Sequence, residues 1–152
     1  MCKFLRKILP SFFFKKIEKA KYFHIDNIEY WKVIERGILA EINLYRKSLE
    51  KGKVSADLNC YNEAVIRTKY LDSIGILTHD GVTLSFDRLN KLGLKHTAEI
   101  LGANHVNATI IVQAWSKSKK HEKIMSSNTY KYCGVSRLKV GKHHFVCVIF
   151  AS

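Results

Sequence analysis

One stretch of the chain, residues 97–125, gathers most of the side chains that could do chemistry. Glu99 lies in the apolar strip AEILG, where burying a carboxylate is costly unless it meets a hydrogen-bond donor or a cation. Ser118 and His121 follow in the segment WSKSKKHEKIM, and His79 lies further upstream. Neutral imidazole binds metals or accepts protons, and protonated imidazole attracts anions. We therefore examine these four residues as a candidate site.

The spacing of apolar residues predicts two short helices in this stretch. Asn107 suits an N-cap, and Ile111 and Trp115 then recur at helical spacing, so the first helix should end near Ser118. Ser118 precedes His121 by three residues, as the N-cap of a second helix would. The positive end of that helix dipole disfavours an imidazolium, so His121 should be neutral near pH 7. On spacing alone, a histidine beside a cap more often carries no function.

Five segments resemble the CAP superfamily, also called SCP domains, and its bacterial branch in particular. Ala98–Gly102 is similar to the family signature A-E-N-[IV]-[AG], and Trp115–Met125 to W-x-x-S-x-x-H-x-x-x-[ILM]. Three further segments resemble family motifs in the expected order: Ile42–Arg46, Thr78–Gly81 and Tyr132–Val135. The similarity runs over about residues 38–150, which is most of the chain.

The resemblance implies a cleft in which His79, Glu99 and His121 converge, with Ser118 beside them. From the residues alone, His79 next to an aspartate is an ordinary loop histidine. Two imidazoles and a carboxylate could hold a divalent cation such as zinc, with His79 and His121 as the metal ligands, or an anion when protonated. Many family members have a second acid where this chain has Ser118, so zinc should bind weakly. The family's asparagine after the motif glutamate is Ile100 here.

Two longer helices are predicted before this stretch. Asp26 and Glu29 resemble a capping box, and apolar residues at steps of three and four then continue from Ile34 to Leu49. Asp57 could cap a second helix, which Gly75 would end. We expect these two helices to form a hairpin. Asn43 and Arg46, in the first of them, match a motif that the resemblance assigns to bracing the fold. A shorter helical phase follows in Phe86, Leu89 and Leu92.

The C-terminal part is predicted to be a β-hairpin. Two strand-like segments, Tyr130–Val140 and His143–Ala151, flank Gly141-Lys142, which suits a type II′ turn. Phe145–Phe150 is apolar without alternation, which indicates a strand covered on both faces. Helices before such a strand pair give an α+β fold, a three-layer α-β-α sandwich with a central, mainly antiparallel sheet, and this is also the architecture of the resembled family.

The register of this hairpin bears on the cysteines. A two-residue turn places Cys133 opposite Phe150 and Cys147 opposite Ser136, so the two cysteines point to opposite faces of the sheet. A Cys133–Cys147 disulfide is therefore not expected. Cys2 and Cys60 have no evident partner, and the resembled bacterial branch lacks the disulfides of the animal proteins. We expect free thiols.

Composition separates an N-terminal leader or arm, residues 1–25, from a CAP-like domain, residues 26–152. The arm is basic and rich in Phe, and its apolar run is too short for a transmembrane helix and has no cleavage site typical of a signal peptide. It could lie on an anionic membrane or pack on the domain. The whole chain has a net charge of +13, which should attract phosphates, anionic lipid or acidic partners.

These features favour a non-enzymatic binding module, surface-exposed or secreted as the resemblance implies. The resemblance also implies a lipid or sterol, an anionic membrane, a glycan, or a host or cell-surface protein as partner. The alternative function is a metal-dependent hydrolase that uses the cleft of His79, Glu99 and His121. Nucleic-acid binding is a third class, suggested by Lys117, Lys119, Lys120 and Lys123, but no known nucleic-acid-binding motif accompanies these lysines.

Overall fold

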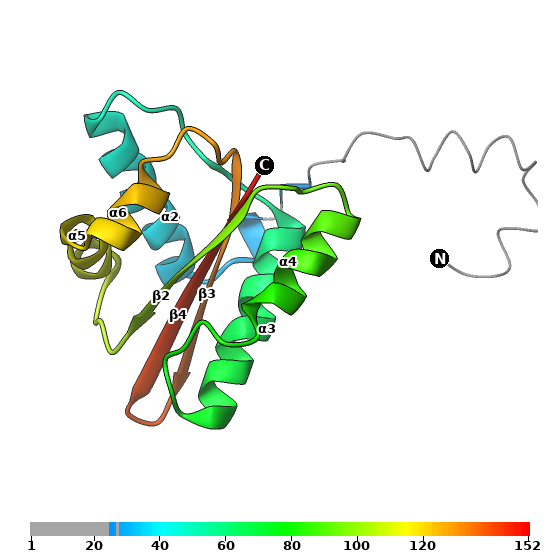
Figure 1. Cartoon of the computed structure of the whole chain (residues 1–152). Helices are drawn as coiled ribbons and strands as arrows, with labels where there is room; N and C mark the ends of the chain where they lie inside the picture. The colour runs from blue at the N-terminus through cyan, green and yellow to red at the C-terminus, as the bar shows by residue number, and fades with distance from the viewer. Residues whose placement is uncertain (1–24, 27) are drawn as a thin grey trace, which may run out of the picture.

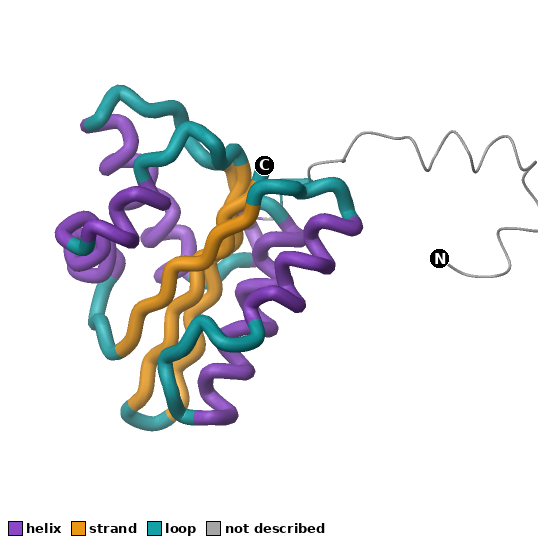
Figure 2. Tube along the Cα trace, viewed as in Figure 1, coloured by secondary structure: helices purple, strands orange, loops and turns teal. Residues whose placement is uncertain are grey.

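The computed structural model describes residues 25–26 and 28–152, in which helices cover both faces of a four-stranded sheet (Figure 1, Figure 2). The helices are α2 (Val33–Ser48), α3 (Leu58–Ile74), α4 (Val82–Lys91), α5 (Ala108–Lys117) and α6 (Lys119–Met125). The strands are β1 (Ser55–Ala56), β2 (Thr97–Ala103), β3 (Tyr132–Val140) and β4 (His143–Ala151). Their order is β1-β3-β4-β2, with only β1 and β3 parallel among the described pairs. The predicted α-β-α sandwich is confirmed.

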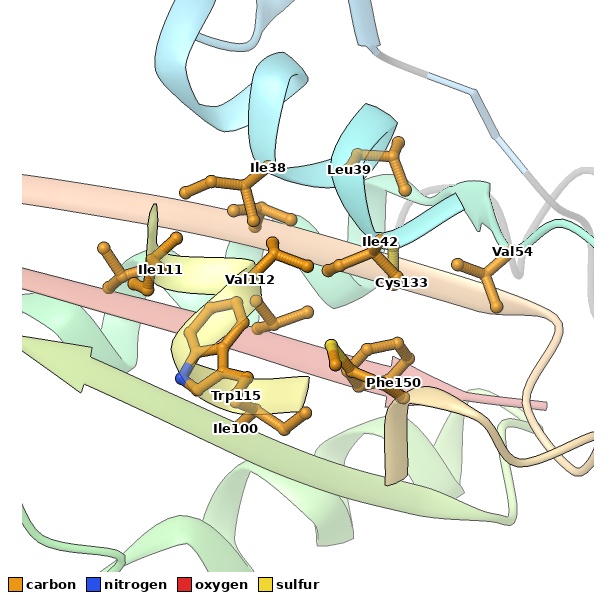
Figure 3. Packing of buried hydrophobic residues seen from close by; sticks show 14 of the residues in the cluster. Ile38, Leu39, Ile42, Val54, Ile100, Ile111, Val112, Trp115, Cys133 and Phe150 are labelled. Atoms are coloured by element: carbon orange, nitrogen blue, oxygen red, sulfur yellow. The ribbon is translucent and has the colours of Figure 1, made fainter. Parts of the chain in front are cut away.

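Each face of the sheet has its own hydrophobic core. Helices α2, α5 and α6 cover one face, and α3 and α4 cover the other (Figure 1). On the first face, Ile42, Val112 and Trp115 pack with Ile100 and Phe150 of the strands (Figure 3). Because β4 is central, its residues 145–151 are all buried, as predicted from their lack of alternation.

The predicted hairpin of the first two helices is wrong. Between α2 and α3 the chain forms β1, which pairs with β3 at the edge of the sheet. The chain therefore passes from one face to the other at this edge, and α2 and α3 contribute to different cores. The helix that lies beside α3 is α4 instead, on the same face (Figure 1).

Helix ends follow local capping chemistry. The Asp57 carboxylate accepts hydrogen bonds from the backbone N–H groups of Asn59 and Cys60, and Gly75 ends α3 with φ 68°. Asn107 caps α5 by accepting from the N–H of Ile110 at 2.9 Å. These three predicted ends are confirmed.

The predicted start of the first long helix is wrong. Asp26 accepts from the N–H of Ile28 and begins only a single 3-10 turn, Ile28–Tyr30. The helix begins at Val33, where the Glu35 carboxylate accepts from the N–H of Lys32 at 2.8 Å. The later site is preferred because Glu35 is fully buried, and it also accepts from the N–H of Arg137 in β3.

The hairpin register is confirmed. Cys133 pairs with Phe150, and Cys147 pairs with Ser136. Cys133 belongs to one core and Cys147 to the other, so the sheet separates them. Cys60, Cys133 and Cys147 are free and buried, and burial raises the pKa of each thiol.

Asn43 and Arg46 brace α2 against the loops, as the resemblance implied. The Arg46 guanidinium donates to the carbonyl oxygens of Gly52, Met125 and Ser127. Asn43 exchanges two hydrogen bonds with the backbone of Val54. Neither side chain is thereby available for chemistry.

Within the described residues, no helix is both long enough and apolar enough to cross a bilayer. The predicted N-terminal leader or arm lies outside the described residues except for Ile25, and so does Cys2. The division between this segment and the domain stays a prediction.

Candidate functional site

The candidate site is built on a buried ion pair between Glu99 and Arg67. Glu99 comes from β2, the edge strand of the sheet, and Arg67 comes from α3. The Arg67 Nε lies 2.6 Å from Glu99 Oε2, and its Nη2 lies 3.2 Å from Oε1. Both side chains are almost completely buried. The sequence predicted that Glu99 needs a donor or a cation, and the structure supplies a two-point guanidinium contact.

The remaining lone pairs of Glu99 are also occupied. Oε1 accepts from His79 Nδ1 at 2.8 Å, and the Cys147 thiol contacts Oε2 at 3.5 Å. A carboxylate has about four lone-pair positions, and Glu99 uses all of them on these three side chains. Glu99 therefore acts as a structural anchor for its neighbours.

Arg67 also fixes the loop that carries His79. Its Nη1 donates to the carbonyl oxygen of Asp80, and its Nη2 donates to that of Thr78, both at 2.8 Å. These two residues flank His79, so one guanidinium holds both the loop and the carboxylate beneath it. The next residue, Gly81, has φ 79°, a left-handed conformation that favours glycine.

His79 is oriented by Glu99 and open to solvent. Because a carboxylate can only accept, Nδ1 carries the proton and Nε2 points away from Glu99. The His79 side chain is 60% exposed. Its Nε2 is an acceptor when the ring is neutral and a donor when it is protonated.

His121 lies close enough to His79 for the two to influence each other electrostatically. It occupies the third position of α6, on the opposite face of the sheet from α3. Partial burial, His79 and Lys120 together lower the pKa of His121. The predicted neutral state is therefore supported, but its main cause is burial rather than the helix dipole.

Ser118 is the N-cap residue of α6, as predicted, but its hydroxyl makes no capping hydrogen bond. Its backbone instead ends α5 and begins α6, by donating to the carbonyl of Trp115 and accepting from the N–H of Glu122. Within the described part of the chain, the hydroxyl makes no hydrogen bond with His79 or His121. A Ser-His pair that could activate a nucleophile is thus not formed in this geometry.

The residues here do not fit a catalytic zinc site. Such a site takes three protein ligands and keeps one open position. Glu99 has no lone pair left, and the Arg67 guanidinium already neutralises its charge. His79 and His121 remain, and no group of three or more possible metal ligands occurs in the described residues. The predicted His79–His121 metal pair therefore gains no third ligand from this part of the chain.

The surface beside His121 is strongly cationic. Residues 117–123 contain four exposed lysines, Lys117, Lys119, Lys120 and Lys123. Glu122 is the one acid among them, and its carboxylate accepts from the Tyr45 hydroxyl at 3.1 Å. Two imidazoles beside such a surface favour anions over cations.

Sequence reasoning missed two residues that shape the site. Arg67 was not singled out because α3 carries apolar residues on both faces, so the helical period gave no inward direction for it. The clue in the sequence was Glu99, because a carboxylate in an apolar strip requires a donor or a cation. Trp115 was placed in a helix and a family motif without a contact, and its indole N–H donates to the carbonyl of Leu101 in β2, which fixes α5 to the edge strand.

The fold defines a class: an α-β-α sandwich with helices on both faces of a mainly antiparallel sheet. The family model described as CAP, the cysteine-rich secretory protein family, matches residues 39–150. The chain therefore belongs to the CAP family. No curated protein sequence matches it.

Solved structures share this fold. An outer surface protein of Borrelia burgdorferi is 20% identical with a TM-score of 0.69, and the match covers 86% of this chain and 97% of that one. A cysteine-rich secretory protein of Staphylococcus aureus is 17% identical with a TM-score of 0.68, covering 82% and 40%. An extracellular SCP-domain protein of Bacillus anthracis is 23% identical with a TM-score of 0.64, covering 78% and 41%. The chain thus spans less than half of the last two proteins.

Proposed function

We propose that this chain is a non-enzymatic binding module, surface-exposed or secreted, whose site at His79 and His121 binds an anionic oxygen group of its partner. The group is a carboxylate, sulfate or phosphate, as found on acidic glycans and on anionic lipid headgroups. The surface or extracellular location is supported by the descriptions of two similar structures, an outer surface protein and an extracellular protein.

The observation that carries the proposal is the saturation of Glu99 by Arg67. In the absence of Arg67, the carboxylate would give the site a negative charge and a metal ligand. With Arg67 bound at 2.6 Å, the acid is neutralised, and the groups left for a ligand are two imidazoles and the nearby lysines. Imidazole N–H groups and lysine ammonium groups both donate hydrogen bonds to oxyanions.

The test measures binding of two probes to the full chain: a heparin-derived oligosaccharide and phosphatidylglycerol vesicles. We expect at least one probe to bind, with affinity falling between about 50 and 500 mM salt because the nearby lysines attract the anion electrostatically. Sugar binding without vesicle binding identifies a glycan as the source of the anion, and the reverse identifies a lipid.

Variants assign the binding to the site. H79N and H121N should each weaken it, whereas H143N, which alters an exposed histidine of the distant hairpin turn, should not. If all three variants bind like the wild type, or if neither probe binds, the proposal is wrong.

A further inference from the structure

A second feature, which shares Arg67 with the histidine site, is a groove between α3 and α4 with a volume of about 310 Å³. Its apolar wall consists of Ile66 and Tyr70 from α3 and Leu84 from α4. Arg67 and Arg88 line it as well. The groove faces away from the sheet, because the opposite side of α3 packs into the core through Ala64 and Leu71.

The apolar wall is unusually exposed. Leu84 is 62% exposed, Ile66 47% and Tyr70 40%. Ile74, also exposed, continues the row on α3 at a further step of four residues, so the row extends over about 12 Å. In contrast, the buried side of α3 includes three polar or charged residues, Glu63, Arg67 and Thr68. Exposed apolar rows on an otherwise well-packed domain mark interaction surfaces.

The groove is held in shape before any partner arrives. Arg88 of α4 donates to both carboxylate oxygens of Glu63 in α3, at 2.8 and 2.7 Å. The Arg67 guanidinium lies over the Tyr70 ring at 5.4 Å and holds the loop that leads into α4. A preformed site loses little conformational entropy on binding.

Charge indicates what the groove would accept. Arg88 uses Nε and Nη2 on Glu63, while its Nη1 makes no hydrogen bond with the described residues and the side chain is 45% exposed. Across α3 and α4 there are four basic residues, Arg67, Lys69, Arg88 and Lys91, and three acids, Glu63, Asp72 and Asp87. A second copy of this basic chain would meet like charge, whereas an acidic segment would meet complementary charge.

We propose that the α3–α4 groove is a docking site for an acidic, amphipathic helix of a partner protein. Apolar side chains spaced three or four residues apart on that helix insert over Ile66, Tyr70 and Leu84, as in other helix-in-groove complexes. A carboxylate next to them pairs with Arg88. The proposal does not rest on the histidine site.

The experiment titrates the full chain into a fluorescent synthetic helix of about 14 residues, four turns long, with leucines on one face and glutamates elsewhere. The control peptide has lysines in place of the glutamates. We expect the glutamate peptide to bind and the lysine peptide to bind at least about tenfold more weakly, because the chain is basic and Arg88 keeps one nitrogen, unbonded within the described residues, for a carboxylate.

Matched variants locate the contact. L84E places a charge on the apolar wall and should weaken binding about tenfold or more. L44E is the control, because Leu44 on α2 is 58% exposed, much like Leu84, but lies on the other layer. Both positions are exposed, so neither substitution should prevent folding.

Three results would overturn the proposal. One is equal binding of the glutamate peptide to L84E and L44E, or no binding to the wild type. Another is self-association of the chain that L84E abolishes in sedimentation equilibrium, which would make a second copy the occupant. The third is binding to phosphatidylglycerol vesicles that L84E weakens, together with peptide binding that L84E leaves unchanged. This combination would make the occupant a lipid.

Discussion

Two nitrogens of the Arg67 guanidinium donate to the Glu99 carboxylate, at 2.6 and 3.2 Å, and both side chains are almost fully buried. A buried carboxylate left without its cation is strongly destabilising. We therefore expect R67M to lower the free energy of unfolding by about 3–5 kcal/mol, measured by urea denaturation. The loss should be accompanied by greater mobility of the loop Thr78–Gly81, since Arg67 also holds its carbonyl groups.

Two controls separate the buried pair from a general loss of charge. R88M breaks the Arg88–Glu63 pair, in which the arginine is 45% exposed although the carboxylate is nearly buried, and should cost less than R67M, about 1–3 kcal/mol. The double variant R67M/E99L removes both charges and should be more stable than R67M alone. If R67M and R88M lower the free energy of unfolding equally, then burial of both partners does not make the Arg67–Glu99 pair more important than the Arg88–Glu63 pair.

Releasing Glu99 should turn the site into one that accepts a cation. In R67Q, the carboxylate regains lone pairs beside His79, which gives a divalent cation two protein ligands, Glu99 and His79. We expect Zn²⁺ to raise the stability of R67Q, by about 2.7 kcal/mol when free zinc is a hundred times the Kd. Thermal unfolding with and without Zn²⁺ measures this. The double variant R67Q/E99Q should lose the effect, and a wild-type protein that zinc stabilises as much as R67Q would refute the argument.

The lowered pKa of His121 predicts how stability depends on pH. Burial, with His79 and Lys120, makes protonation harder in the folded chain than in the unfolded chain, where the pKa is about 6.5. Between the lowered value and about 6.5 the unfolded chain binds more protons, so stability falls as pH decreases through this window and is fully present above it. H121N should flatten this part of the curve in urea unfolding series, and the exposed-residue variant H143N should not.

The strands and several caps could be predicted from the sequence because their determinants are local. The glycine of the Gly141-Lys142 turn and the two-residue side-chain period fix the register, and hence the separation of Cys133 from Cys147. Asp57 and Asn107 cap helices through bonds to residues two or three positions away. None of these depends on the rest of the fold.

What the sequence did not predict depends on contacts between distant residues. Glu35 begins α2 in place of Asp26 because Glu35 also bonds to Arg137, 102 positions later. Arg67 reaches Glu99 across 32 positions, from a helix whose two faces are both partly apolar. The family motifs identified His79, Glu99 and His121, but they say nothing of the arginine that sets the charge of the site.

The closest approach of helix to sheet predicts the most damaging small substitution. At Gly134 in β3, an added Cβ would clash with the backbone of Cys60 and Tyr61 in the first turn of α3. Backbone cannot rotate away as a side chain can, so G134A should force α3 off the sheet and lower the free energy of unfolding by about 3 kcal/mol. The matched control is G52A, where a Cβ meets nothing within 4 Å and φ is not positive, so its change should stay within about 0.5 kcal/mol. Because α3 carries both Arg67 and the groove wall, G134A should also weaken the peptide binding proposed for the groove, and a G134A protein as stable as G52A would show that the helix does not pack this closely.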